Sequence, residues 1–100
     1  MLLRERDTGK GLLVSVCDAD CLGETYEAGE VSLTVEEGFY GGEEAREADA
    51  EAVVQSLTRA NVANIVGEEA VGVAVEAGLV DEETVLELDG TRHAQLLWLR

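Results

Sequence analysis

The stretch from Asn61 to Gly78 is the longest periodic apolar segment in the chain, and it limits the possible folds more than any other stretch. Its apolar side chains recur at helical spacing, at Val62, Ile65, Val66, Ala70, Val73, Ala74 and Ala77. Asn61 or Asn64 could cap the start of a helix by accepting from its free N–H groups. Gly78 suits the left-handed position that ends one. We therefore predict a central helix across this segment, with a short kink over 61–64 that separates it from the preceding element.

A second helix is expected from Glu43 to Ala60. Its apolar stripe is formed by Ala50, Val53, Val54 and Leu57, and acidic residues crowd its start, where the helix dipole favours them. Strands are predicted from apolar runs and from alternation, over 2–6, 12–17, 30–36, 84–88 and 91–100. Between the second and third strands, Asp18 is expected to cap a single turn and Gly23 to end it.

The last two predicted strands are joined by Asp89-Gly90, which is typical of a tight hairpin turn with positive φ at both central residues. A two-residue loop would place Leu88 opposite Thr91, Glu87 opposite Arg92 and Leu86 opposite His93. The whole order is strand, strand, strand, helix, helix, strand, strand (βββααββ). This order favours a single α+β domain over residues 1–100. We expect a two-layer sandwich in which two helices pack on one face of an antiparallel or mixed sheet of about five strands.

The charge balance is extreme, because 22 acidic residues oppose 7 basic ones and give a net charge of −15. Such a chain repels itself in dilute salt, although 46% of its residues are hydrophobic, as in an ordinary folded domain. Molar salt shortens the Debye length to about 3 Å and weakens this repulsion. We interpret the acids as an adaptation to a salt-rich cytoplasm rather than as an acidic interaction tail. No apolar run reaches the roughly 18 residues of a membrane span, and the N-terminus lacks a signal-peptide core, so a cytoplasmic location and no membrane partner are expected.

The two cysteines, Cys17 and Cys21, are three residues apart, which differs from the two-residue gap of common zinc and redox motifs. Cys17 ends an apolar run and is expected to be a buried thiol. A metal site would need His93, or Asp18 and Asp20, to join the cysteines. We expect no metal and no cofactor.

Five ordered motifs together resemble the archaeal DUF424 family of uncharacterised proteins: Cys17-Asp-Ala-Asp-Cys-Leu-Gly23, Phe39-Tyr-Gly-Gly-Glu-Glu44, Asn61-Val-Ala-Asn-Ile-Val-Gly-Glu68, Gly78-Leu-Val80 and His93-Ala-Gln95. The resemblance implies a small two-layer α/β sandwich and, with the acidic composition, a haloarchaeal source. It implies a loose association with translation and RNA but no established reaction. The family usually has proline before His-Ala-Gln, where this chain has Arg92, so the start of the last strand is expected to be less rigid.

Neutral planar or aromatic side chains form the predicted site, and such groups suit recognition better than bond breaking. The candidate binding residues are Phe39, Tyr40, Gly41, Gly42, Asn61, Asn64, His93 and Gln95. Weaker candidate RNA contacts are Arg4, Arg6, Lys10 and Arg100. Each has a plainer role open to it: Phe39 can plug the core, the asparagines can cap a helix, and the single histidine can be structural.

We therefore expect a non-enzymatic binding module that docks on RNA or a ribonucleoprotein of the translation machinery, and we assign no catalytic residue. The scarcity of basic residues weakens the RNA hypothesis. One alternative is a small-molecule-binding protein or enzyme with a pocket near Tyr40 and His93, in which Asp18 could be a general base. Another is a protein-interaction adaptor that binds through a sheet edge or the aromatic patch.

Overall fold

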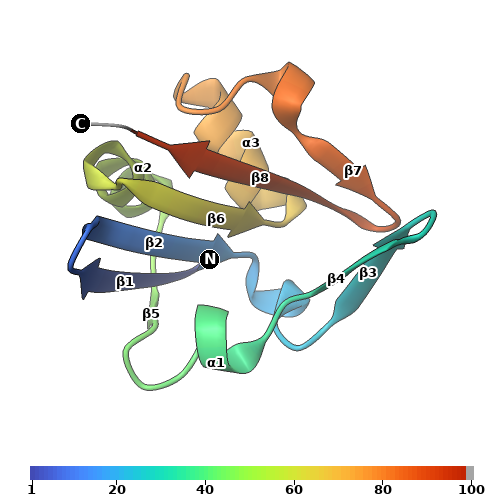
Figure 1. Ribbon diagram of the computed structural model, residues 1–100, viewed down its shortest axis with the longest axis horizontal. Coiled ribbons are helices and arrows are strands. Elements are labelled where there is room, and N and C mark those ends of the chain that lie inside the picture. The colour runs from blue at the N-terminus through green and yellow to red at the C-terminus, as the bar shows by residue number, and fades with distance from the viewer. Residues whose placement is uncertain (99–100) are drawn as a thin grey trace.

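The chain forms a six-stranded mixed sheet in a computed structural model that describes residues 1–98 (Figure 1). In spatial order its strands are β5 (Arg46–Glu47), β1 (Leu2–Thr8), β2 (Gly11–Cys17), β6 (Val62–Val66), β8 (Thr91–Leu97) and β7 (Leu86–Leu88). The strands β2 and β6 are parallel, and the other neighbours are antiparallel. A separate antiparallel hairpin consists of β3 (Thr25–Ala28) and β4 (Val31–Thr34).

Three α-helices and two 3₁₀ turns connect these strands within residues 1–98. They are α1 (Glu37–Tyr40), α2 (Ala50–Arg59), α3 (Glu68–Glu76), η1 (Ala19–Cys21) and η2 (Glu82–Thr84). None of these helices has the length and apolar composition needed to cross a bilayer.

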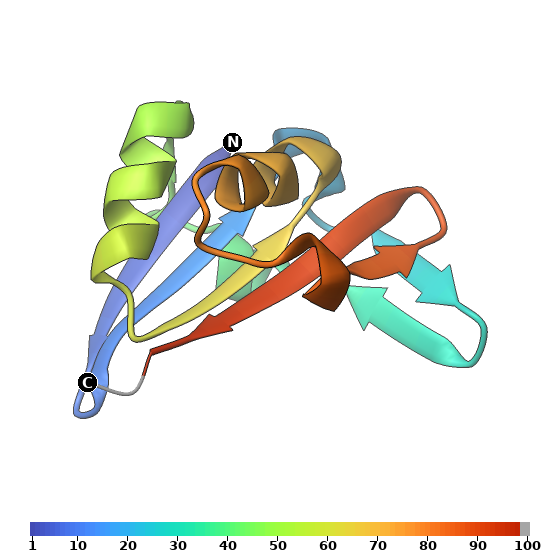
Figure 2. The ribbon, with the colours of Figure 1, turned by 90° about the horizontal axis from the view of Figure 1, so that it is seen from above.

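The helices α2 and α3 lie together on one side of the sheet, which we call the helix face (Figure 2). The main core lies between them and the strands, and its fully buried members include Val14, Val16, Val53, Leu57, Ala63, Ile65, Val71 and Ala74. We call the other side the reverse face. A smaller apolar cluster lies there, formed by Cys17, Cys21, Val35, Tyr40 and Val66. The helix α1 and the segment around η1 thus cover one part of the reverse face.

The prediction of one helix across 61–78 is wrong, because Val62–Val66 is a strand and α3 begins at Glu68. Ala63 and Ile65 are fully buried against the helices, whereas Val62 is exposed on the reverse face, so this segment has a period of two. Its β-branched residues suit a strand, and a short apolar run fits either periodicity. Gly67, with a φ of +123°, separates the strand from the helix.

The second predicted helix is shorter than expected, because α2 starts only at Ala50. The carboxylate of Asp49 accepts a hydrogen bond from the Ala52 N–H at 2.9 Å and caps this start. Residues 43–49 instead form a turn and the short edge strand β5. Acidic residues do lie near the start of this helix, as the helix dipole favours, but the helix starts at Ala50 and not at Glu43.

Other expectations are confirmed in whole or in part. The chain has a mixed sheet with helices in an α+β arrangement, and two helices share one face. The expected βββααββ order is wrong, because a strand separates α2 from α3. The sheet has six strands rather than about five, and the described residues add a third helix and a separate hairpin. The last hairpin has the predicted register, with Leu88 opposite Thr91 and Leu86 opposite His93. Gly78 follows α3 with a φ of +75°, and its N–H donates to the Val75 carbonyl at 3.0 Å.

Candidate binding face

Strand register aligns four polar side chains in one row across the reverse face. Arg4 of β1 lies opposite Ser15 of β2, Ser15 lies beside Asn64 of β6, and Asn64 lies opposite Gln95 of β8. The side-chain amide of Gln95 donates to the Asn64 carbonyl oxygen at 2.9 Å. Gln95 is exposed and Asn64 is half-buried. Two of the predicted binding residues, far apart in sequence, are therefore held together at the surface by their own hydrogen bond.

The neighbouring row on the reverse face is mostly apolar, and it runs through Arg6, Leu13, Val62 and Leu97. Val62 is 39% exposed and Leu97 is 67% exposed. A shallow pocket of about 280 Å³ adjoins this row at the β1–β2 turn, and its lining includes Lys10, Leu13 and Val62. It does not include Tyr40 or His93, where a small-molecule pocket was expected.

His93 lies on the same face in the next row, between Val66 of β6 and Leu86 of β7. The ring is half-buried, and this burial lowers the pKa of His93. Because residues two apart on a strand share a face, His93 and Gln95 project on the same side of the sheet. The structure therefore places His93 and Gln95 on one face, as their spacing on the predicted strand implies, and brings Asn64 of β6 beside them.

The aromatic pair lies elsewhere and is mainly structural. Tyr40 is only 4% exposed, and burial raises its pKa to about 12. The Phe39 ring contacts it edge to face, with the ring centroids 5.0 Å apart. A Cβ on Gly41 would lie 3.1 Å from the Glu37 carbonyl oxygen, so this position requires a small residue. Gly42 adopts a φ of +91°. Tyr40 is therefore inaccessible as a binding platform.

Two of the candidate RNA-binding arginines support the aromatic segment instead. Arg4 donates to the carbonyls of Gly38 and Gly41 at 3.0 and 2.8 Å. Arg6 donates to the carbonyls of Gly38 and Phe39, both at 3.1 Å, and its guanidinium lies 4.7 Å from the Phe39 ring centroid. Their charged groups satisfy the end of α1. Lys10 is exposed in the β1–β2 turn, and Arg100 lies outside the described residues.

Asn61 joins two elements and does not cap a helix. Its side-chain oxygen accepts from the Leu12 N–H at 2.9 Å, and its own N–H donates to the Leu12 carbonyl at 2.9 Å. A Cβ on Gly11 would collide with the Asn61 side chain, so glycine is required beside this contact. Asn64, the other expected cap, lies within β6.

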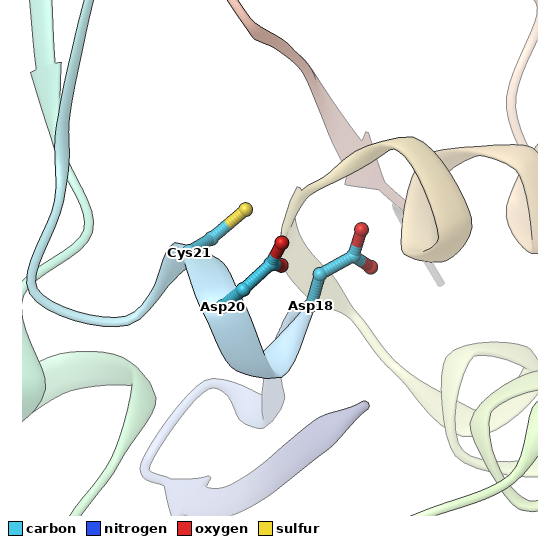
Figure 3. Close-up of side chains that lie close together, drawn as sticks. All are labelled: Asp18, Asp20 and Cys21. Carbon is cyan, nitrogen blue, oxygen red and sulfur yellow. The ribbon is translucent and has the colours of Figure 1, made fainter.

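Asp18, Asp20 and Cys21 bring their side-chain ligand atoms within 4.8 Å of one another (Figure 3). The Asp18 carboxylate, however, accepts from the N–H groups of Glu69 and Ala70 at 3.0 and 2.8 Å. It thereby caps α3 and not, as predicted, the turn η1 that follows it. Both of its oxygens are occupied by these amides, which does not suit a general base.

The two cysteines are free and buried, as expected for reduced thiols. Burial is the main cause that raises the pKa of Cys17 to about 12, so its thiolate is disfavoured. The Cys21 sulfur lies 3.8 Å from the Thr91 hydroxyl oxygen. We assign both cysteines to the smaller core.

The main feature that the sequence prediction missed is the distribution of charge over the sheet. Within residues 1–98, the strands β1, β2, β6, β7 and β8 place no carboxylate on the reverse face, and Glu47 of the edge strand β5 is the one acid of the sheet on that side. The acids of these strands, Glu5, Asp7 and Glu87, occupy the alternate positions that face the helices. Strand parity would have revealed this in the sequence, had β6 been recognised as a strand.

Part of this acid-free surface is left open by α1. We call it the uncovered patch, and it consists of Leu13, Val62, Asn64, Gln95 and Leu97. Val62, Gln95 and Leu97 are exposed, and the other two are half-buried. Exposed apolar groups beside fixed amides can bind another molecule by burial and by hydrogen bonding.

The comparisons with known proteins agree with the sequence resemblance. The chain is similar to the crystal structure of an uncharacterized conserved protein from Methanopyrus kandleri, with 30% sequence identity and a TM-score of 0.72 over 99% of this chain and 94% of that chain. A search of curated proteins found no match. The family described as "Protein of unknown function (DUF424)" matches residues 5–99. The chain therefore belongs to the DUF424 family.

Proposed function

We propose that this chain is a non-enzymatic binding module that docks on a ribonucleoprotein of the translation machinery through the uncovered patch. The observation that carries the proposal is the absence of carboxylates from this surface in a chain with 22 acids. Acidic side chains keep a surface hydrated and repel other copies and other acidic molecules. A patch without them, with Val62 and Leu97 exposed, can be dehydrated at lower cost.

The chemistry of the patch supports recognition rather than catalysis. Asn64 and Gln95 are neutral amides that neither titrate nor act as nucleophiles at ordinary pH, and their mutual hydrogen bond fixes their orientation. Of the groups that could perform acid–base chemistry, Asp18 is engaged in capping α3 and Tyr40 is buried. His93 is half-buried with a lowered pKa, and the thiol on its row, Cys17, is fully buried with a pKa raised to about 12, which disfavours a nucleophilic thiolate.

Within a ribonucleoprotein, a protein component suits the patch better than the RNA itself. Binding to phosphates depends on lysine and arginine, and Arg4 and Arg6 are already engaged with backbone carbonyls. Among the described residues, Lys10 is the remaining base that lines the pocket next to the patch. The exposed leucine and valine side chains instead match the apolar centre of a protein interface.

Co-sedimentation with archaeal ribosomal particles in about 2 M KCl tests this proposal, because screening at that salt removes nonspecific charge effects. Val62→Asn removes apolar surface from the patch without adding charge, and we expect at least about a fivefold loss of sedimented protein from the lost burial. Val31→Asn is the matched control, since Val31 is 53% exposed on β4, away from the patch. Equal sedimentation of both variants, or wild-type protein found only in the particle-free fraction, would contradict the proposal. Digestion of exposed RNA distinguishes an RNA contact from a protein contact.

A further inference from the structure

The outer edge of β8 lacks a strand neighbour beyond His93 within the described residues. The strand β7 pairs with β8 only from Thr91 to His93, whereas β6 pairs with it as far as Leu97. The chain forms η2 before it enters the sheet at Leu86, so β7 begins only there (Figure 1). Residues 94–97 of β8 therefore have a partner on one side and an open edge on the other.

The direction of each backbone group at this edge follows from the ladder. Trp98 donates its N–H to the Asn61 carbonyl at 2.8 Å, and the Gly67 N–H donates to the Arg92 carbonyl at 2.9 Å. Because antiparallel ladders alternate, the even-numbered residues of β8 bond to β6 and the odd-numbered ones point outward. His93 is paired with Leu86, so Gln95 and Leu97 direct their N–H and C=O groups to the open edge.

The other edges of the large sheet carry acids at outward-facing positions. Ala48 donates its N–H to the Met1 carbonyl, so Leu3, Glu5 and Asp7 are the outward-facing residues along β1. Because β5 pairs with β1 only at Leu2 and Leu3, the outward-facing residues on the rest of β1 are Glu5 and Asp7. Glu87 takes this position in the middle of β7, and β3 lies beside the same edge, where the Asp89 N–H donates to the Glu27 carbonyl at 2.7 Å. Charged residues at edges prevent strand addition, and the outward-facing positions Gln95 and Leu97 of β8 carry none.

Apolar surface is concentrated at the same edge. Within residues 1–98, the exposed large hydrophobic residues other than Val31 are Val62, Leu86, Leu97 and Trp98. Val62 lies opposite Leu97 across the β6–β8 pair, and Leu86 lies opposite His93 across the β7–β8 pair. An added strand would cover Leu97 with alternate side chains while its backbone pairs with β8.

We propose that the edge of β8 at Gln95 and Leu97 binds an extended segment of a basic protein as an additional strand. This inference deepens the proposed function, because it names the binding mode and the chemistry of the partner. The partner is basic because the chain carries a net charge of −15 and because the exposed acids Asp81 and Glu83 flank Glu82, which forms an ion pair with Arg92 of β8 at 3.2 Å. The same net charge opposes a second copy of this chain.

The test uses a blocked ten-residue peptide of alternating valine and lysine, titrated into the full chain and followed by amide hydrogen exchange. We expect new protection of the Gln95 and Leu97 amides, whereas the Ala94 and Leu96 amides, which belong to the β6 ladder, are protected before the peptide is added. A peptide of alternating valine and glutamate is the charge control and should bind at least about tenfold more weakly at low salt. Equal affinity for both peptides would contradict the proposal that the partner is basic. Unchanged amide exchange at Gln95 and Leu97 would contradict the proposal that the peptide binds at the edge of β8.

Leu97→Pro provides the matching variant, because proline removes one outward-facing N–H and leaves the β6–β8 hydrogen bonds in place. Leu97→Ala retains that N–H and loses only the side chain. We expect the proline variant to bind the peptide at least about fivefold more weakly than the alanine variant, through the lost backbone hydrogen bond. Equal binding would contradict strand addition.

Two further results separate this inference from the proposed function. If Val62→Asn abolishes co-sedimentation while Leu97→Pro sediments like Leu97→Ala, the patch binds but the edge does not, and this inference fails alone. Sedimentation velocity of the chain without peptide tests self-association. A dimer with protected Gln95 and Leu97 amides would replace the basic partner with a second copy.

Discussion

At the scale of single residues, one carboxylate and one glycine determine how α3 joins the sheet. Asp18, at the end of β2, accepts from the Glu69 and Ala70 N–H groups and so satisfies donors that the first turn leaves free. Gly67 precedes α3 with a φ of +123°, and a Cβ there would collide with the Asp18 carboxylate. The two residues therefore depend on each other: the capping interaction requires glycine at 67.

His93 gives a pH dependence that belongs to this scale. Burial lowers its pKa, so the unfolded chain binds more protons than the folded chain between the folded pKa and the ordinary value of about 6.5. The free energy of unfolding should therefore fall as the pH decreases through that window, and the contribution of neutral His93 to stability should be fully present above it. Urea titrations from about pH 7.5 to 5 measure the slope. Since His93 is the single histidine, His93→Gln should reduce this slope of unfolding free energy against pH. An equal slope in the variant would contradict the assignment of the pH dependence to His93.

At the scale of elements, α1 illustrates a helix that depends on distant side chains. It spans Glu37–Tyr40, which is too short to be stable alone. Arg4 and Arg6, from β1, donate to carbonyls at its end, and Tyr40 is buried beneath it. The arginines therefore fix α1 over one part of the reverse face and leave the other part open.

Arg4→Lys tests this role, because the flexible lysine ammonium lacks the rigid guanidinium plane that directs one nitrogen, Nη1, at the carbonyls of both Gly38 and Gly41. We expect a local loss of about 1–3 kcal/mol, as for hydrogen bonds to charged groups. The amide of Gly41, which donates to the Glu37 carbonyl at 2.9 Å, should exchange about tenfold faster or more. Arg46→Lys, at the exposed strand β5, is the control. Unchanged exchange at Gly41 would show that α1 is held by other contacts.

At the scale of the whole molecule, the charge is distributed unevenly. Within residues 1–98, the acids lie on helices, turns, the separate hairpin, the edge strand β5 and the helix-facing positions of the other strands, while the reverse face of β1, β2, β6, β7 and β8 has none. A net charge of −15 on a chain with a radius of gyration of 12.5 Å opposes compaction in dilute salt. The fold is therefore expected to depend on screening.

Raising KCl from about 0.1 M to 2 M should increase stability, because the Debye length falls from about 10 Å to below 3 Å. A gain of about 1 kcal/mol corresponds to a rise in Tm of about 4–8 °C for a domain of this size, which calorimetry can measure. A variant with the exposed residues Glu30, Glu36 and Glu43 changed to glutamine should show a smaller rise. An equal or larger rise in that variant would indicate that salt acts by another route.

The sequence by itself determined the features that depend on nearby residues. The register of the β7–β8 hairpin followed from Asp89-Gly90, and the end of α3 followed from Gly78, because turn and cap geometry are set within a few residues. The family followed from five ordered motifs. His93 and Gln95 share one face, as expected for residues two apart on the predicted last strand, whereas Asn64 was placed on a helix and Tyr40, expected in the same group, is buried.

Only the tertiary structure decided whether residues 62–66 form a helix or a strand. The apolar residues of this run fit a helical stripe as well as a buried strand, and the choice depends on neighbours distant in sequence: β2 and β8 pair with this segment, and the helices bury Ala63 and Ile65 on one face. The capping of α3 by Asp18 and the engagement of Arg4 with α1 likewise join residues far apart in the chain. Such contacts form because folding brings those segments together, and no local pattern encodes which distant partner a side chain will find.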